Sequence, residues 1–183
     1  MACNNANPTL HDCVFEENGA NGIAGNGGGM ACHSLSQAEI TGCIFKGNHA
    51  NGLLGYASGL SISTSSPTLT NCEIMDNSAT FFGAITCTKD SFPIMIGSRV
   101  CGNTPGQISG SFIDQGDNCI EESCIDCPCP DFNGDGTTDG EDLGILLAEW
   151  GVCTSCIADI SNDGIVDGED LGLLFAGWGL CIQ

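Results

Sequence analysis

The feature that most constrains the fold of this chain is a short sequence pattern that recurs along its first part. The copies span residues 7–20, 37–50, 66–79 and 92–105. Each copy holds short apolar stretches separated by turn residues, and a unit of this size cannot bury its own apolar face. The copies therefore have to stack on one another around a shared core, which predicts a β-solenoid.

Three apolar positions keep their place in the first three copies. They are Leu10, Cys13 and Phe15, then Ile40, Cys43 and Phe45, then Leu69, Cys72 and Ile74. Side chains alternate across a β-strand, so these positions are expected to face inward and to stack as columns. The cysteines among them are expected to pack as small apolar residues. The intervening position, held by Glu73 in the third copy, is expected to face outward.

A polar position also recurs, as Asn18, Asn48, Asn77 and Asn103. Stacked rungs would bring these side chains to about 4.8 Å from one another, the spacing at which amides form a hydrogen-bonded ladder. The alternative is four unrelated turn asparagines, because asparagine is common in turns.

Residues 15–18 and 45–48 have the spacing F-x-x-N, and Gly83-Ala84-Ile85 is similar to G-G-A-[ILV]. At these residues the chain resembles the polymorphic outer-membrane protein repeat, over about residues 1–113. The resemblance implies a mainly β fold, a right-handed parallel β-helix of about four rungs, in a secreted or surface protein. It implies no activity.

The start of the chain repeats an internal segment, because Met1-Ala2-Cys3 recurs as Met30-Ala31-Cys32. The chain therefore begins inside a rung. We expect further rungs and a signal peptide upstream in the parent protein, and hence an N-terminally truncated β-helix.

The apolar columns stop at residue 114, where cysteine, acidic residues and proline take over. This change predicts a linker over residues 114–130. A second, duplicated module is then expected over residues 131–183.

Two acidic loops in this module have the pattern of a calcium site. Oxygen-bearing residues occupy positions 1, 3, 5, 9 and 12 of a twelve-residue loop, position 7 offers a backbone carbonyl, and glycine at position 6 allows the sharp turn. The predicted ligands are Asp131, Asn133, Asp135, Thr137, Asp139 and Asp142 in the first loop and Asp159, Ser161, Asp163, Ile165, Asp167 and Asp170 in the second. Two Ca²⁺ ions are therefore expected.

A nearly identical helix is predicted after each loop, over residues 141–150 and 169–178. Apolar residues recur in them at helical spacing, as Leu143, Leu146, Leu147 and Trp150 and as Leu171, Leu174, Phe175 and Trp178. These stripes are expected to bury each other. Residues 131–183 hold 11 acidic side chains and no Lys or Arg, so folding is expected to depend on the bound ions.

This half of the chain resembles dockerin, a duplicated loop–helix calcium module with Asp at position 12. The resemblance implies a small α-helical module that follows the β-helix. In that family, loop positions 10 and 11 help to recognise a cohesin partner. Here these positions are Gly140, Glu141, Gly168 and Glu169, and a cohesin-like or cell-surface protein is the expected partner.

Fourteen cysteines in 183 residues indicate an oxidising, extracellular or cell-surface setting. We predict disulfides between Cys129 and Cys153 and between Cys156 and Cys181, each closing one loop–helix unit. Cys119, Cys124 and Cys127 are candidates for further disulfides at the boundary. A zinc site built from Cys124-x-x-Cys127 and Cys153-x-x-Cys156 is the alternative.

The net charge of −20, with only 3 Lys and Arg, disfavours nucleic acid, which requires clustered cations. The sequence contains no stretch long enough to span a membrane. His11, His33 and His49 have no repeated partner motif, and no catalytic residue is predicted.

Together these features favour a non-catalytic calcium-dependent assembly or anchoring module on an extracellular β-helix, with a polysaccharide as a second candidate partner. The alternative is the C-terminal part of a polysaccharide-degrading lyase or glycoside hydrolase whose catalytic rungs lie upstream. A third interpretation is that the paired loops only cap the solenoid.

Overall fold

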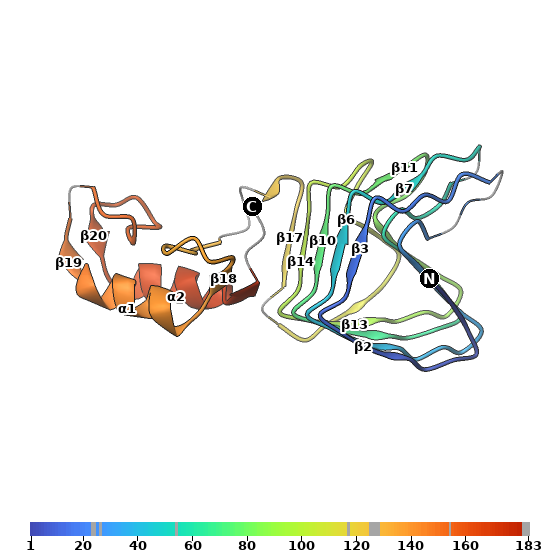
Figure 1. Ribbon diagram of the computed structural model, residues 1–183, viewed down its shortest axis with the longest axis horizontal. Coiled ribbons are helices and arrows are strands. Elements are labelled where there is room, and N and C mark those ends of the chain that lie inside the picture. The colour runs from blue at the N-terminus through green and yellow to red at the C-terminus, as the bar shows by residue number, and fades with distance from the viewer. Residues whose placement is uncertain are drawn as a thin grey trace. The chain divides into compact units, whose positions relative to one another are not determined.

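The structure is a computed structural model that describes residues 1–22, 25, 27–53, 55–116, 118–124, 129–153 and 155–180. It divides into two compact units, Met1–Asp126 and Cys127–Gln183 (Figure 1). The division lies inside the predicted linker.

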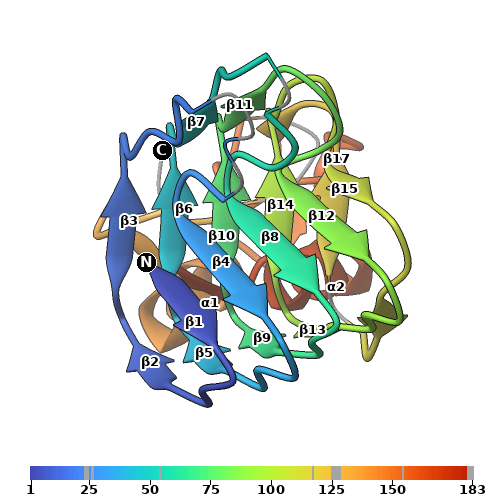
Figure 2. The ribbon, with the colours of Figure 1, turned by 90° about the vertical axis from the view of Figure 1, so that its right-hand side faces the viewer.

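The first unit is a parallel β-solenoid in which, over the described residues, each of three sheets has five strands. The first sheet contains β1 (Ala2–Asn4), β4 (Met30–His33), β8 (Leu60–Ser63), β12 (Ile85–Thr88) and β15 (Ile108–Ser109), in this order (Figure 2). The second contains β2 (Thr9–His11), β5 (Glu39–Thr41), β9 (Thr68–Thr70), β13 (Ile94–Ile96) and β16 (Ile113–Asp114). The third contains β3 (Val14–Glu16), β6 (Ile44–Lys46), β10 (Glu73–Met75), β14 (Arg99–Cys101) and β17 (Cys119–Glu121). Two short strands, β7 (His49–Ala50) and β11 (Ser78–Ala79), pair beside them.

The register of the sheets confirms the predicted stacking of the sequence copies. Leu10 pairs with Ile40, and Ile40 with Leu69, so matched positions lie directly above one another. The rings of Phe15 and Phe45 stack with their centroids 4.7 Å apart. The predicted inward columns are confirmed, because Ile40, Phe45, Leu69 and Ile74 are fully buried within one apolar cluster.

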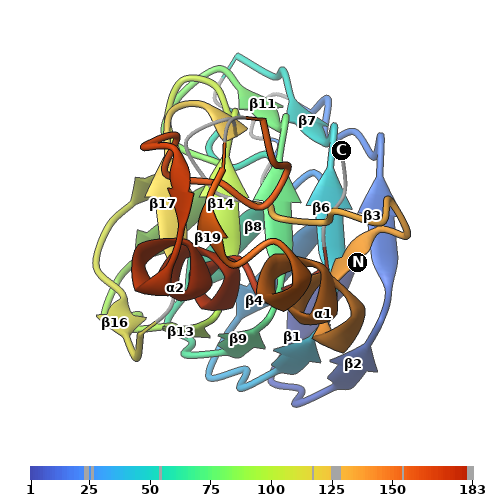
Figure 3. The ribbon, with the colours of Figure 1, turned by 90° about the vertical axis from the view of Figure 1, so that its left-hand side faces the viewer.

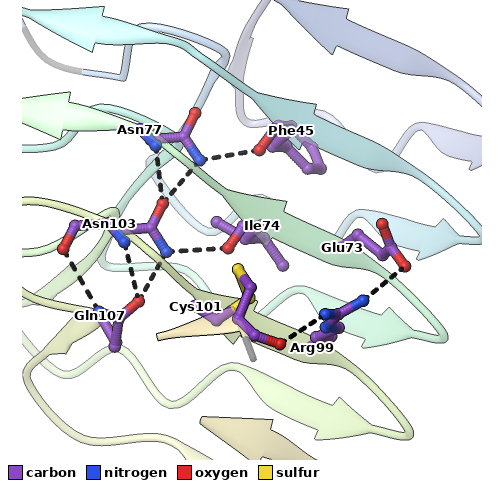
Figure 4. The surroundings of a disulfide bond; sticks show 9 residues. Phe45, Glu73, Ile74, Asn77, Arg99, Cys101, Asn103 and Gln107 are labelled. Carbon is purple, nitrogen blue, oxygen red and sulfur yellow. Dashed lines mark hydrogen bonds and ion pairs between the residues drawn. A yellow bond between two sulfur atoms is a disulfide. The ribbon is translucent and has the colours of Figure 1, made fainter. Parts of the chain in front are cut away.

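The expectation for Glu73 is wrong, because its side chain is buried. On the neighbouring rung, the Nη1 atom of Arg99 lies 4.0 Å from Oε1 of Glu73 (Figure 4). A charged side chain at this position is therefore held beside an opposite charge.

The asparagine ladder is confirmed. The side-chain amide of Asn77 donates to Oδ1 of Asn103 at 3.0 Å and to the carbonyl of Phe45 at 2.8 Å, while its own Oδ1 accepts from Asn48 at 2.9 Å (Figure 4). The ladder ends on Gln107, whose Oε1 accepts from Nδ2 of Asn103 at 2.7 Å. Each rung thus provides the buried hydrogen-bond partners for the next.

The predicted linker begins too early, because its first residues form another solenoid layer. Ile113 pairs with Ile94, and Ile120 pairs with Val100 and packs against the apolar cluster. Asn118 occupies in this layer the position that Ser98 occupies in the preceding rung. Its Oδ1 accepts from the backbone N–H of Ser98 at 2.8 Å. This last layer is short and polar. The loss of apolar columns in the sequence therefore did not mark the end of the solenoid.

At two of the solenoid's corners, a polar side chain and a glycine alternate from rung to rung. Asp12 and Gly42 both have positive φ at one corner, as do Asn71 and Gly97 on the next two rungs. A Cβ atom added to Gly42 would meet Oδ1 of Asp12. The polar side chain of one rung therefore takes the space above the glycine of the next.

Replacement of Gly42 by alanine is expected to lower the free energy of unfolding by about 2 kcal/mol, through left-handed backbone strain and this contact. In an Asp12→Gly background the contact is gone, and the cost is expected to fall to about 1 kcal/mol. Urea unfolding of the four variants checks this. Equal costs in the two backgrounds would show that Asp12 does not occupy this space.

The buried thiols form hydrogen bonds in addition to filling space. The Cys72 thiol donates to the carbonyl of Thr70 at 3.3 Å, and the backbone N–H of Cys13 donates to Sγ of Cys43 at 3.4 Å. Ser98 continues the column, and its hydroxyl accepts from the N–H of Cys72 at 3.1 Å. The expectation that these cysteines act only as apolar residues was therefore incomplete.

Burial raises the pKa of the Cys32, Cys72 and Cys87 thiols from 9.0 to about 12. In the unfolded chain the thiols ionise near the ordinary value. The stability gained by keeping them neutral is thus present below pH 9.0 and is lost as the pH rises toward about 12.

We expect the solenoid to unfold at progressively lower urea concentration as the pH is raised above 9.0. Cys72→Ser, the residue found at position 98, is expected to fold and to show a smaller decline. An unfolding midpoint that is independent of pH in this range, or that declines equally in both proteins, would contradict the prediction.

The second unit contains two loop–helix segments. Helix α1 (Gly140–Ala148) and helix α2 (Gly168–Ala176) lie side by side and contact each other (Figure 3). Strand β18 (Thr137–Thr138) pairs antiparallel with β21 (Gly179–Leu180), and β19 (Gly151–Val152) pairs with β20 (Ile165–Val166). Leu146 and Leu174 are fully buried between the segments. In the part of the chain that the structure describes, no helix has the length and apolar character needed to cross a membrane.

Candidate metal centre

The carboxylate of Asp131 organises the first acidic loop. Its Oδ1 atom accepts from the backbone N–H groups of Gly134 at 2.8 Å and Asp135 at 3.1 Å, and its Oδ2 atom accepts from Gly136 at 2.9 Å. The positive φ of Gly134 and Gly136 turns the backbone so that these N–H groups reach the same side chain. Position 1 of the loop therefore lies beside positions 4 to 6.

The second loop repeats this arrangement. Oδ1 of Asp159 accepts from the N–H of Asp163 at 3.1 Å, and its Oδ2 accepts from Gly164 at 3.0 Å. Oδ1 of Asp163 accepts from Ile165 at 2.8 Å, as Oδ1 of Asp135 accepts from Thr137 at 2.9 Å. The sequence duplication is thus also a duplication of backbone conformation.

The aspartates at position 12 join the start of each loop to its helix. Asp142 is fully buried, and its Oδ1 accepts from Phe132 at 2.7 Å while its Oδ2 accepts from Asp139 at 2.9 Å. Asp139 caps α1 through the N–H of Glu141, and with Asp142 it forms a capping box.

Asp170 has the same place at the start of α2, where Asp167 is the N-cap residue. It is fully buried, and its carboxylate accepts from the N–H groups of Ser161 at 2.9 Å and Asp167 at 2.9 Å. Burial opposes ionisation of Asp170, but these hydrogen bonds outweigh it and lower the pKa of the carboxyl below its ordinary value. The side chain at position 12 therefore accepts from backbone N–H groups at the start of both loops.

Asp135 is exposed, and its pKa is also lowered, first by the Thr137 hydroxyl at 2.7 Å and then by the Thr137 N–H. In the second loop, Ile165 offers only its backbone groups at the matched position. Thr137 and Ile165 can each still provide a backbone carbonyl, as a calcium loop requires at position 7.

The chemistry of the donor set fits a hard cation, since each loop brings carboxylate, amide or hydroxyl oxygens and a backbone carbonyl together within twelve residues. Among the described residues, no three Asp, Glu, His or Cys side chains are gathered closely enough to hold a metal ion by themselves. A bound ion would thus have to draw in the side chain of Asn133 or Ser161 and the carbonyl at position 7 as well. The loops would then provide the ligands, and the cation would complete their closure.

The predicted burial of the helix stripes is only partly correct. Leu146 and Leu174 are buried, but Leu147, Trp150, Phe175 and Trp178 are between 42% and 54% exposed. The ring centroids of Phe175 and Trp178 lie 5.5 Å apart. With nine residues each, the helices are too short to bury four apolar positions apiece against one another. Sequence periodicity identified these side chains but assigned them to the core.

The residues predicted to recognise a partner, Gly140, Glu141, Gly168 and Glu169, lie in the first turns of α1 and α2 and are exposed. The structure does not test their role.

The predicted disulfide pairing is wrong. Cys153 is bonded to Cys156, whose Cα lies 5.9 Å away, so neither can pair with Cys129 or Cys181. Cys156 is three residues from Cys153 along the chain, and the prediction had placed the two cysteines in different disulfides. Cys129 is disulfide-bonded, and Cys181 lies outside the described residues.

The first unit contains a disulfide between Cys101 and Cys124, and Cys119 is also disulfide-bonded. Of the four cysteines of the alternative zinc site, Cys124, Cys153 and Cys156 are therefore oxidised and cannot act as thiolate ligands. Cys127 lies outside the described residues.

Comparisons of the chain with protein-family models, curated proteins and solved structures find no match. The resemblances to dockerin and to the polymorphic outer-membrane protein repeat thus have no support from a matching family.

Proposed function

We propose that the second unit is a calcium-binding, dockerin-like assembly or anchoring module, and that the solenoid is the extracellular or cell-surface element that it attaches. The observation that carries this proposal is the exposure of four large apolar side chains at matched positions of the two loop–helix segments, in the last turn of each helix and two residues beyond it. Each segment begins with an acidic loop of the same conformation. Large exposed apolar groups on a soluble module are typical of protein–protein contact surfaces.

Calcium has a defined role in this proposal. Each cation would neutralise part of the acidic loop and fix the start of the helix that follows it, because Asp142 and Asp170 belong both to the loop and to the helix cap. The exposed side chains of each helix would then be presented in one orientation. The four residues Gly140, Glu141, Gly168 and Glu169 lie in the first turns of the helices, next to these capped ends, and would contribute polar contacts to the partner.

The ligand assignment follows from the loop positions. Ten side chains would contribute oxygen atoms and Thr137 and Ile165 their backbone carbonyls, as the pattern of an oxygen-liganded calcium loop requires. One ion per loop supplies the positive charge that the acidic unit lacks.

The test is a partner capture from the secreted and surface proteins of the source cells, with the full chain as bait. Calcium-dependent capture of one protein, lost in a Trp150→Ala/Trp178→Ala variant and kept in a Phe92→Ala variant, would support assembly. Phe92 is a suitable control because it is an exposed aromatic residue of the solenoid. If calcium stabilises the chain but capture is the same with and without it, the module only caps the solenoid and the proposal fails.

A further inference from the structure

The segments that follow β7 and β11 carry exposed apolar side chains, and these do not belong to the second unit. Phe81 and Phe82 are 46% and 47% exposed, and Leu53 on the neighbouring rung is 78% exposed. The rings of Tyr56 and Phe82 stack with their centroids 5.4 Å apart and their planes 21° from parallel. We call the rings of Tyr56, Phe81 and Phe82, together with the aliphatic side chain of Leu53, the aromatic ridge.

The backbone beneath the aromatic ridge is closely packed. The N–H of Phe81 donates to the carbonyl of Gly55 at 2.9 Å, and the Thr80 hydroxyl donates to the carbonyl of Gly52 at 3.0 Å. A Cβ atom added to Gly52 would meet the carbonyl oxygen of Gly22 on the rung before. The rings are thus attached to a supporting layer in which successive rungs touch through their backbones.

The chain segments that carry the aromatic ridge contain no acidic or strongly basic side chain. Residues 47–72 and 77–88 contain no Asp, Glu, Lys or Arg, although the whole chain has a net charge of −20. Asn51 and Thr80 are exposed in the same segments. Asn51 offers an amide group, and the Thr80 hydroxyl, which donates to the carbonyl of Gly52, can still accept a hydrogen bond. The ridge therefore combines aromatic faces with neutral hydrogen-bonding groups.

We infer that the aromatic ridge binds a neutral polysaccharide. A pyranose ring has one face lined by C–H groups and a rim of hydroxyls, so it matches an aromatic surface bordered by amides and hydroxyls. An acidic polysaccharide would need cations, and residues 47–72 and 77–88 provide none. A second copy of the chain or an apolar protein would bury the rings without using the polar border. This binding does not require calcium, so it can succeed or fail independently of the proposed assembly function.

The experiment is a binding assay with the full chain in excess EGTA, using insoluble cellulose, xylan and mannan as neutral probes and polygalacturonate as the acidic probe. We expect the wild-type chain to be retained on at least one neutral probe. Phe82→Ala is expected to bind about tenfold more weakly, because it removes a ring that would stack on the sugar. Phe92→Ala, which removes a ring of similar exposure elsewhere on the solenoid, is expected to bind normally. Phe81→Ala provides a second test should Phe82→Ala change the circular dichroism spectrum.

Three results would overturn the inference. These are no retention on any neutral probe, stronger retention on polygalacturonate than on all of them, and equal retention of the Phe82→Ala and Phe92→Ala variants. Light scattering adds a fourth: self-association of the wild type that Phe82→Ala abolishes would identify the ridge as an interface between copies.

Discussion

Removal of calcium is expected to unfold the second unit and to leave the solenoid folded. Residues 131–183 hold 11 acidic side chains and no cation, while their described core consists of a few residues around Leu146 and Leu174. At a thousandfold excess over the dissociation constant, each bound ion would contribute about 4 kcal/mol to the stability of the unit. A core this small cannot replace that contribution.

The two units can be followed separately in this experiment. Both tryptophans, Trp150 and Trp178, are in the second unit, so tryptophan fluorescence reports its unfolding. The β signal in circular dichroism comes mainly from the solenoid. We expect EGTA to shift the tryptophan fluorescence to that of an unfolded chain at room temperature, and added calcium to restore it.

The matched variant is Asp131→Asn/Asp159→Asn. The amide oxygen can still accept the backbone N–H of Gly136 or Gly164. The amide nitrogen replaces the oxygen that accepts from Asp135 or Asp163, and the charge that attracts the ion is lost. We expect this variant to need at least tenfold more calcium to fold. Asp90→Asn, an exposed substitution at a positive-φ corner of the solenoid, controls for charge alone. An equal calcium requirement in both variants would refute the ligand assignment.

Replacement of Asn77 by alanine is expected to cause the largest loss of solenoid stability. The substitution removes the acceptor of the Asn48 backbone N–H at 2.8 Å and of its side-chain amide at 2.9 Å, and it removes the donor to the Phe45 carbonyl at 2.8 Å. These groups are buried, so each of them left unpaired costs about 1–3 kcal/mol. We expect a total loss of about 4 kcal/mol in the free energy of unfolding.

Asn18→Ala is the control, because Asn18 is the exposed first member of the same ladder and only donates to Asn48. Its loss is expected to cost about 1 kcal/mol. Thermal unfolding followed by circular dichroism in saturating calcium compares the two variants. A similar loss in both would mean that the ladder does not act as a buried network.

The solenoid could be predicted from the sequence because its repeats fix the stacking of side chains. Matched residues such as Phe15 and Phe45 lie one above the other, and the equivalent asparagines form the expected ladder. Its end could not be predicted, because the last layer keeps only Ile120 of the inward apolar columns and substitutes Asn118 for the cysteine or serine of earlier turns. Gln107 at the end of the ladder follows no repeat and was missed for the same reason.

In the second unit, periodicity could predict the helices but could not separate buried from exposed apolar positions. Leu146 and Leu147 are neighbours with the same hydrophobicity, yet one is buried and the other is exposed, because only the paired segments decide which side is covered. The predicted disulfide pairing was wrong for a related reason. The prediction assigned one disulfide to each loop–helix unit and so separated Cys153 from Cys156, which lies three residues away along the chain.

The duplication also explains why the loops were recognisable from sequence. The same carboxylate-to-backbone contacts recur at Asp131 and Asp159, and each requires a glycine at the sixth loop position. Side-chain identity at these positions is therefore constrained by the backbone conformation itself.

The most direct measurement is isothermal titration of the EGTA-treated and dialysed full chain with calcium chloride. Twin oxygen-lined loops predict heat that saturates at two ions per chain and falls below detection in Asp131→Asn/Asp159→Asn at the same concentrations. A titration of the wild-type chain without binding heat, accompanied by unchanged tryptophan fluorescence, would contradict the calcium assignment and the assembly function built on it.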